Sequence, residues 1–203
     1  MITALIVSAA YIAAQMMADI ASLRIVLLAG MSIDAGTFIY PLTFTLRDLV
    51  HKTAGIKAAR ALIIAAAVIN LIMAGLFWFV SRLPADPQVG PQLEFAAVLS
   101  PVWRIVFASI VAEVISELID TEAYRFWVEQ VTRRYQWARV LISNTLSVPL
   151  DSLVFAWLAF GGVLPNSVVW SIVLSNILVK GITTLLSIPG IYLVKESQTN
   201  VGA

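Results

Sequence analysis

Long apolar segments constrain the fold of this chain more than any other feature. A helix that crosses a bilayer needs about 20 mostly apolar residues, and six segments approach this length. Of all residues, 60% are hydrophobic and only 12% are charged, whereas soluble domains carry about 25% charged residues. We predict an all-α membrane protein with a single transmembrane domain (residues 1–203) and spans near 2–24, 37–50, 58–80, 102–127, 138–163 and 168–194.

Two connections between these spans depart from a regular helix. Between residues 25 and 40, Gly30 and Gly36 flank a Ser-Ile-Asp-Ala turn signal. This pattern predicts a short irregular connection after the first helix, either hairpin-like or re-entrant. The segment 83–101 contains several prolines, which forbid a continuous helix, and its 92–99 portion is predicted to lie along the membrane interface.

Basic residues are concentrated in two of the connections. The positive-inside rule places loops that are rich in Lys and Arg in the cytoplasm. We therefore expect these two loops and both termini to be cytoplasmic. The basic residues are Arg47, Lys52, Lys57 and Arg60 after the second span, and Arg125, Arg133, Arg134 and Arg139 after the fourth.

Charge and composition argue against several classes of function. The formal net charge of +1 provides no basic surface for nucleic acid. The chain has no cysteine and a single histidine, His51, so disulfides and a zinc site are not expected. We expect no metal, no cofactor and no enzymatic activity, because no nucleophile and base are paired in the sequence.

Polar side chains inside the predicted spans are the candidate functional residues, because a charge near the bilayer centre costs a few kcal/mol. Spacings of three and four residues place the polar groups of each span on one helical face. Such stripes on four helices predict a shared polar cavity. The residues are Gln15 and Asp19 in the first span, Glu113, Glu117 and Asp120 in the fourth, Asn144, Ser147 and Asp151 in the fifth, and Asn176 and Lys180 in the sixth.

Structural roles for some of these groups remain open alternatives. Glu113 is a potential ion-pair partner of Arg104, and Asp19 is a potential partner of Arg24 at the interface. The alternative role of Lys180 is to neutralise one aspartate within a packed bundle.

A short pattern, S-x-x-x-D-[TS]-x-x-[YF], occurs at 116–124 and again at 147–155. Consecutive spans run antiparallel, so the two copies have opposite orientations, as in the inverted repeats of transporters. Pro149 loosens the backbone near Asp151 in the second copy. A similarity of nine residues also arises by chance, so the pattern alone is weak.

Several motifs together resemble the vitamin-uptake, or queuosine-precursor, transporter family. They are residues 38–44 (F-I-Y-P-L-T-F), Arg47-Asp48, residues 55–60 (G-I-K-A-A-R), the doubled serine-to-aspartate pattern, and Lys180 followed by Pro189 and Tyr192. The resemblance covers residues 19–193. It implies a six-span protein of the bacterial inner membrane that imports a 7-deazaguanine, such as 7-cyano-7-deazaguanine or 7-aminomethyl-7-deazaguanine.

The resemblance also implies residue roles. The aspartates of the family fall on Asp48, Asp120 and Asp151, and its lysine falls on Lys180. The chain departs from the family pattern at Asp19, where the family often has Asn, and at Glu117, where it often has Gln. Both departures add a carboxylate and put the exact substrate in doubt.

The chemistry of the polar residues suits such a nucleobase-like ligand. A carboxylate can accept two hydrogen bonds from the adjacent N–H donors of a deazaguanine. Its flat face suits stacking on an aromatic ring. The predicted rings are Phe44, Tyr124, Trp127 and Phe155, each of which is otherwise explained by packing or lipid contact.

Two other functions compete with this one. The first is a substrate-binding subunit that docks on a coupling-factor partner. The Ala10-x-x-x-Ala14-x-x-x-Ala18 face of the first span allows close helix approach and suits such docking. Packing within the bundle explains the same face equally well. A homodimer is a further possible assembly, with membrane lipid around it. The second competing function is an intramembrane aspartyl protease that uses Asp120 and Asp151, but the Gly-x-Gly-Asp element of that class of protease is missing from the sequence.

Overall fold

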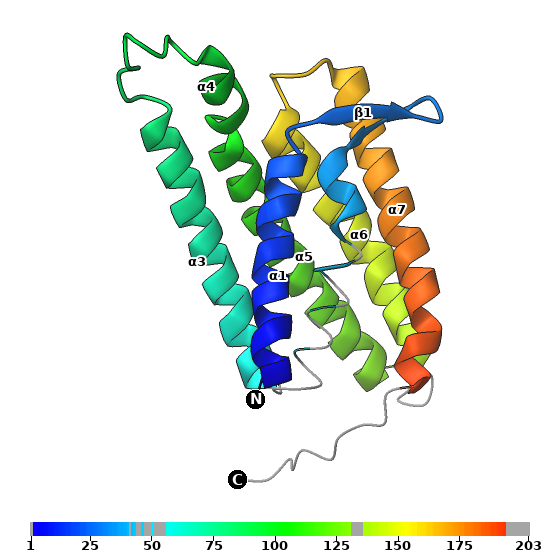
Figure 1. Cartoon of the computed structure of the whole chain (residues 1–203). Helices are drawn as coiled ribbons and strands as arrows, with labels where there is room; N and C mark the ends of the chain where they lie inside the picture. The colour runs from blue at the N-terminus through cyan, green and yellow to red at the C-terminus, as the bar shows by residue number, and fades with distance from the viewer. Residues whose placement is uncertain are drawn as a thin grey trace.

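A computed structural model describes residues 2–40, 42, 43, 46, 50, 56–130 and 136–193. Within these residues, five long helices form a bundle (Figure 1). They are α1 (Ile2–Ala21), α3 (Ile56–Val80), α5 (Val102–Gln130), α6 (Gln136–Phe160) and α7 (Asn166–Leu193), together with the short helix α4 (Leu93–Leu99).

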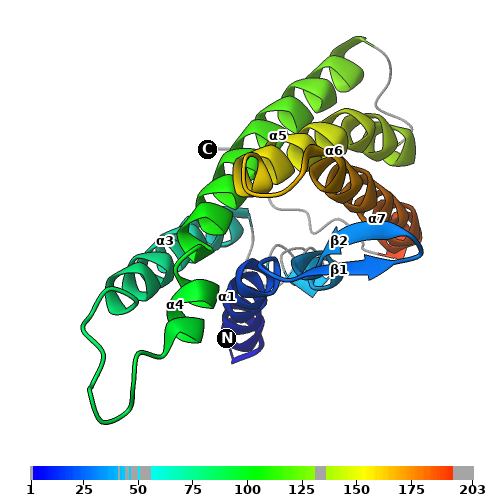
Figure 2. The same ribbon diagram turned by 90° about the horizontal axis from the view of Figure 1, so that it is seen from above.

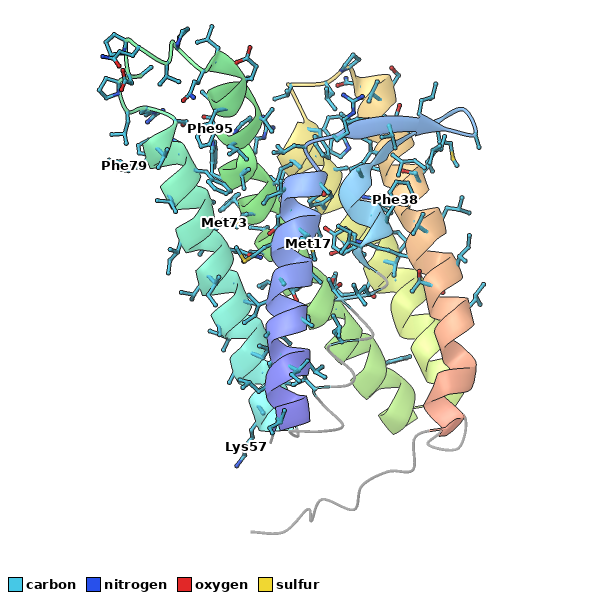
Figure 3. All side chains as sticks on the ribbon, viewed as in Figure 1. Met17, Phe38, Lys57, Met73, Phe79 and Phe95 are labelled. Atoms are coloured by element: carbon cyan, nitrogen blue, oxygen red, sulfur yellow. The ribbon has the colours of Figure 1, made fainter. Side chains whose placement is uncertain are left out.

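Four stretches of the described chain are long and apolar enough to cross a membrane. They are Ala4–Ala21, Lys57–Val80, Leu93–Ser116 and Asn166–Thr183, and α6 adds a shorter apolar stretch, Thr145–Phe160. The predicted second span, 37–50, lies mostly outside the described residues, so the count of six spans stays a prediction. Outward-facing side chains are largely apolar, as lipid contact requires; Phe79 and Phe95 are examples (Figure 3).

α1 and α3 run in the same direction, and from α3 onward the long helices alternate in direction. At one end of the bundle, called here the N-terminal end, α1, α3 and α6 begin and α5 and α7 end (Figure 1). Lys57 extends from this end (Figure 3). At the opposite end, called the hairpin end, lie the α1–η1 connection, residues 81–92 and residues 161–165. These directions are the ones that the predicted six-span topology gives to the first, third, fourth, fifth and sixth spans.

A β-hairpin follows α1 at the hairpin end. Strands β1 (Ile25–Leu28) and β2 (Met31–Asp34) pair antiparallel, with Leu28 opposite Met31. Ala29 and Gly30 form the two-residue turn, and both have positive φ, 51° and 80°, as a type I′ turn requires. The hairpin-like form of the predicted connection is therefore confirmed. It is the one departure from the predicted all-α class within the described residues, and the 3₁₀ helix η1 (Ala35–Phe38) follows it.

Three apolar clusters hold the helices together. The largest joins α5, α6 and α7, where Ala108 and Ala156 are fully buried and allow close helix approach. A second joins α3 to α5 through Met73 and Val102. A third packs α1 on α3 around Tyr11. Viewed from above, α5 runs diagonally from α3 to α6, and the hairpin lies beside α7 (Figure 2).

Candidate functional site

Asp34, at the end of β2, is fully buried and is the centre of a hydrogen-bond network. The backbone amide of Thr37 donates to its Oδ1 over 3.2 Å, and the Thr37 hydroxyl lies 2.8 Å from its Oδ2. The hydroxyl of Ser22 donates to Oδ1 over 2.9 Å. Asp34 therefore caps η1 and ties it to the end of α1, which is an anchoring role.

Asn176 on α7 extends this network and retains hydrogen-bonding capacity. Its Oδ1 lies 2.6 Å from the Thr37 hydroxyl, and its Nδ2 is buried without a partner. Thr37 has one hydroxyl proton and cannot donate to both Asp34 and Asn176. Turning the Asn176 amide over lets Nδ2 donate to Thr37 instead. In either orientation, one polar atom of this fully buried amide stays free for a ligand.

Asp151 on α6 and Lys180 on α7 form an ion pair. The Lys180 side chain is 8% exposed and that of Asp151 is 17% exposed. Lys180 Nζ also lies 4.8 Å from the centre of the Tyr40 ring, within the range of a cation–π contact. The structure thus brings together two residues that the sequence predicted on separate helices.

Asp19 lies in the last turn of α1 and is 2% exposed. Asn70 Nδ2 on α3 donates to its Oδ2 over 2.9 Å, and the Ser109 side chain on α5 lies close to it. The Glu113 carboxylate is close enough to interact with it electrostatically. The alternative pairing of Asp19 with Arg24 is wrong, because Arg24 is exposed and Asp19 is bound by neutral groups.

Arg104 on α5 has a different partner from the one considered above. Its Nε donates to the Leu158 carbonyl over 2.7 Å, and its Nη2 donates to the Gly161 carbonyl. These carbonyls lie at the C-terminal end of α6, where a positive charge is favoured by the helix dipole. The pairing of Arg104 with Glu113 is therefore wrong.

Some of the remaining predicted residues are described by the structure, and the others lie outside its described part. Gln15 Nε2 donates to the Tyr11 hydroxyl over 3.0 Å, and Ser147 is buried on α6. Phe155 is a core residue, 2% exposed and edge-on to Phe160, so it is not a stacking surface. Outside the described residues or side chains lie Phe44, Asp48, His51, Glu117, Asp120, Tyr124, Trp127 and Asn144.

Sequence analysis missed several members of the polar interior. Asp34 and Thr37 match the D-x-x-T pattern of a helix N-cap, which was a usable signal. Asn70 is the one polar side chain of α3 after Arg60, which was a second signal. Within the described residues, no group of three or more acidic or histidine side chains is placed to hold a metal ion.

Comparison with known proteins identifies the family. The sequence model of the family described as "Putative vitamin uptake transporter" matches residues 34–194. The chain belongs to this family. The resemblance noted in the sequence is thus confirmed, and membership together with the apolar helices makes this a multi-pass membrane protein.

A curated relative agrees with the family. The chain is 24% identical over 189 residues to a protein of Bacillus subtilis (strain 168) named "Probable queuosine precursor transporter". The match covers 90% of this chain and 80% of the relative. No solved structure matches the chain significantly.

Proposed function

We propose that this protein imports a queuosine precursor, a 7-deazaguanine such as 7-cyano-7-deazaguanine or 7-aminomethyl-7-deazaguanine, across the bacterial inner membrane. The observation that carries the substrate class is the Bacillus subtilis relative, because the match extends over 90% of the chain. Family membership supports transport, and no catalytic step is included in the proposal.

The base binds in the polar interior next to Asp151, Lys180 and Asn176. Lys180 and Asp151 form an ion pair, and a carboxylate can accept both adjacent N–H groups of a deazaguanine. Asp151 is the more exposed member of the pair, so we assign the contact with the base to its carboxylate. The free amide atom of Asn176 suits a second polar group on the base.

Residues on α5 and α6 extend this site toward the N-terminal end. Glu117 and Asp120 follow Glu113 by four and seven positions in the sequence, a spacing that predicts a shared helical face. We assign the acceptance of base N–H groups to these carboxylates together with Asp151. The remaining proposed lining residues are Tyr124, Asn144 and Ser147 on the same helices and Phe44 before α3.

The protein acts without a coupling-factor partner in this proposal. The small-residue face of α1 was the feature that favoured such a partner, but Ala14 and Ala18 are buried inside the bundle. These two residues pack α1 within the protein, so they are not a docking surface. No other observation favours the coupling-factor subunit.

A ligand panel tests the substrate class directly. Purified protein is heated with deazaguanines, guanine, adenine and a vitamin such as biotin, and we expect only deazaguanines to raise its melting temperature strongly. Asp151→Asn should weaken binding by about 1.5 to 3 kcal/mol, the range for hydrogen bonds to a charged group. Glu94→Gln, an exposed change on α4, is the matched control. Equal binding of biotin and deazaguanines would contradict the proposal.

A further inference from the structure

Asp19 is a buried carboxylate, and no positively charged side chain in the described part of the chain is paired with it. Its hydrogen-bond partner Asn70 and the nearby Ser109 are neutral, and the charge that acts on it among the described residues is the carboxylate of Glu113. Burial of an ion without a counter-charge costs several kcal/mol. Asp151 differs because it is paired with Lys180. Asp34 also has only neutral partners, but a backbone amide and two hydroxyls contact its two oxygens.

Asn70 provides a partner for either protonation state of this carboxylate. Its Nδ2 donates to the ionised form, whereas its Oδ1 is buried without a partner. When Asp19 carries a proton, the amide turns over and Oδ1 accepts from the new O–H group. Because the amide is 6% exposed, water does not replace it in this role.

The charged and titratable groups that face this site come from every adjoining element. Glu113 comes from α5, and Tyr40 follows η1 and lies near Asp19, Asp34 and Asp151. Lys180 from α7 is the cation of this interior among the described residues, and Asp151 holds it. A proton is therefore the positive charge that the site can take up.

We propose that Asp19 binds and releases the proton that drives uptake. The proposal rests on the transport function proposed above and names its energy source. During inward transport, Asp19 gains an O–H bond from the outer solution and loses the proton to the cytoplasm. Asp19 lies at the hairpin end of α1, which the charge distribution places outside.

A chain of contacts links the proton site to the substrate site. The Ser109 side chain on α5 lies close to both Asp19 and Tyr40. Tyr40 in turn faces Lys180, which holds Asp151. A change of protonation at Asp19 therefore alters a network that reaches the carboxylate assigned to the base.

Two assays on the same proteoliposomes separate this inference from the proposed function. Counterflow exchange of labelled for unlabelled 7-cyano-7-deazaguanine needs only a carrier, whereas accumulation against a gradient needs an energy source. With one proton per substrate, a pH one unit lower outside supports about tenfold accumulation, since one pH unit is about 1.36 kcal/mol. A protonophore should abolish it.

The variants are compared by the ratio of gradient-driven accumulation to counterflow. In Asp19→Asn we expect this accumulation to fall to the level without a gradient, because the amide cannot carry the proton. Asp86→Asn, a change in the exposed 81–92 connection, should keep the ratio of the parent protein. Asn70→Ala should shift the pH of half-maximal uptake, and it provides a second variant if Asp19→Asn does not fold.

The outcomes are distinct. Absence of counterflow in the parent protein contradicts the proposed function, and the proton inference falls with it. Counterflow without accumulation under a pH gradient overturns the proton inference alone. Accumulation driven by a sodium gradient, or a parent-like ratio in folded Asp19→Asn, overturns it as well.

Discussion

The backbone amide of Ser32 on β2 donates a 2.7 Å hydrogen bond to Ser171 Oγ on α7. One helical turn later, the Ser175 hydroxyl lies 3.1 Å from the Ser32 carbonyl oxygen. Both backbone polar groups of Ser32 thus meet hydroxyls on one face of α7. The hairpin is attached to the helix that also carries Asn176 and Lys180, so its position and that of the site are connected.

Removal of the Ser171 hydroxyl should loosen the hairpin. Ser171→Ala leaves the Ser32 amide without its acceptor, and the loss of one hydrogen bond costs about 1 kcal/mol. We expect amide exchange of a peptide covering 25–34 to become about fivefold faster, measured by hydrogen–deuterium exchange. Ser167→Ala, exposed and one turn earlier on the same helix, should leave the rate unchanged. Equal rates in both variants would show that the contact does not hold the hairpin.

The Asp151–Lys180 pair should behave as a mutually dependent unit. Lys180→Met leaves Asp151 without its cation, and breaking a buried pair costs about 3 to 5 kcal/mol. The double variant Lys180→Met/Asp151→Asn should recover most of this loss, because neither charge remains. Melting temperatures of the purified proteins measure the effect, with Lys57→Met on the exposed end of α3 as the control. A double variant as unstable as Lys180→Met would contradict the pairing.

Two glycines should respond in opposite directions to the same substitution. A Cβ at Gly36 would lie 2.0 Å from Ser22 Oγ and 2.5 Å from the Ala18 carbonyl oxygen. We expect Gly36→Ala to destabilise the protein by about 1 to 3 kcal/mol through overpacking. Gly75 on α3 has nothing within 4 Å of the same position, so Gly75→Ala should stabilise by about 0.5 to 1 kcal/mol. Thermal melts of both variants decide the comparison.

The membrane orientation is directly testable because the chain contains no cysteine. In intact cells, a membrane-impermeant maleimide should label Val89→Cys, at the hairpin end, but not Lys57→Cys, at the N-terminal end. Both positions are exposed, so permeabilised cells should label both and serve as the control. The reverse pattern in intact cells would place the N-terminal end outside.

Sequence alone predicts the features that depend on nearby residues. Apolar length locates the helices, and Gly30 marks the hairpin because its positive φ favours glycine. The partners of polar groups depend instead on packing between distant segments. Thr37 meets Asn176 across 139 positions, and Arg104 is drawn to the end of α6 because unpaired helix carbonyls lie there. No local pattern encodes either pairing.

The attachment of Arg104 to the end of α6 has a mechanical consequence. Its guanidinium group bridges the Leu158 and Gly161 carbonyls, so α5 and α6 are clamped at the hairpin end. Two rods that are clamped at one end can separate only at the other. Any rearrangement that separates α5 from α6 should therefore open the bundle at the N-terminal end, with the hinge at Arg104 (Figure 1).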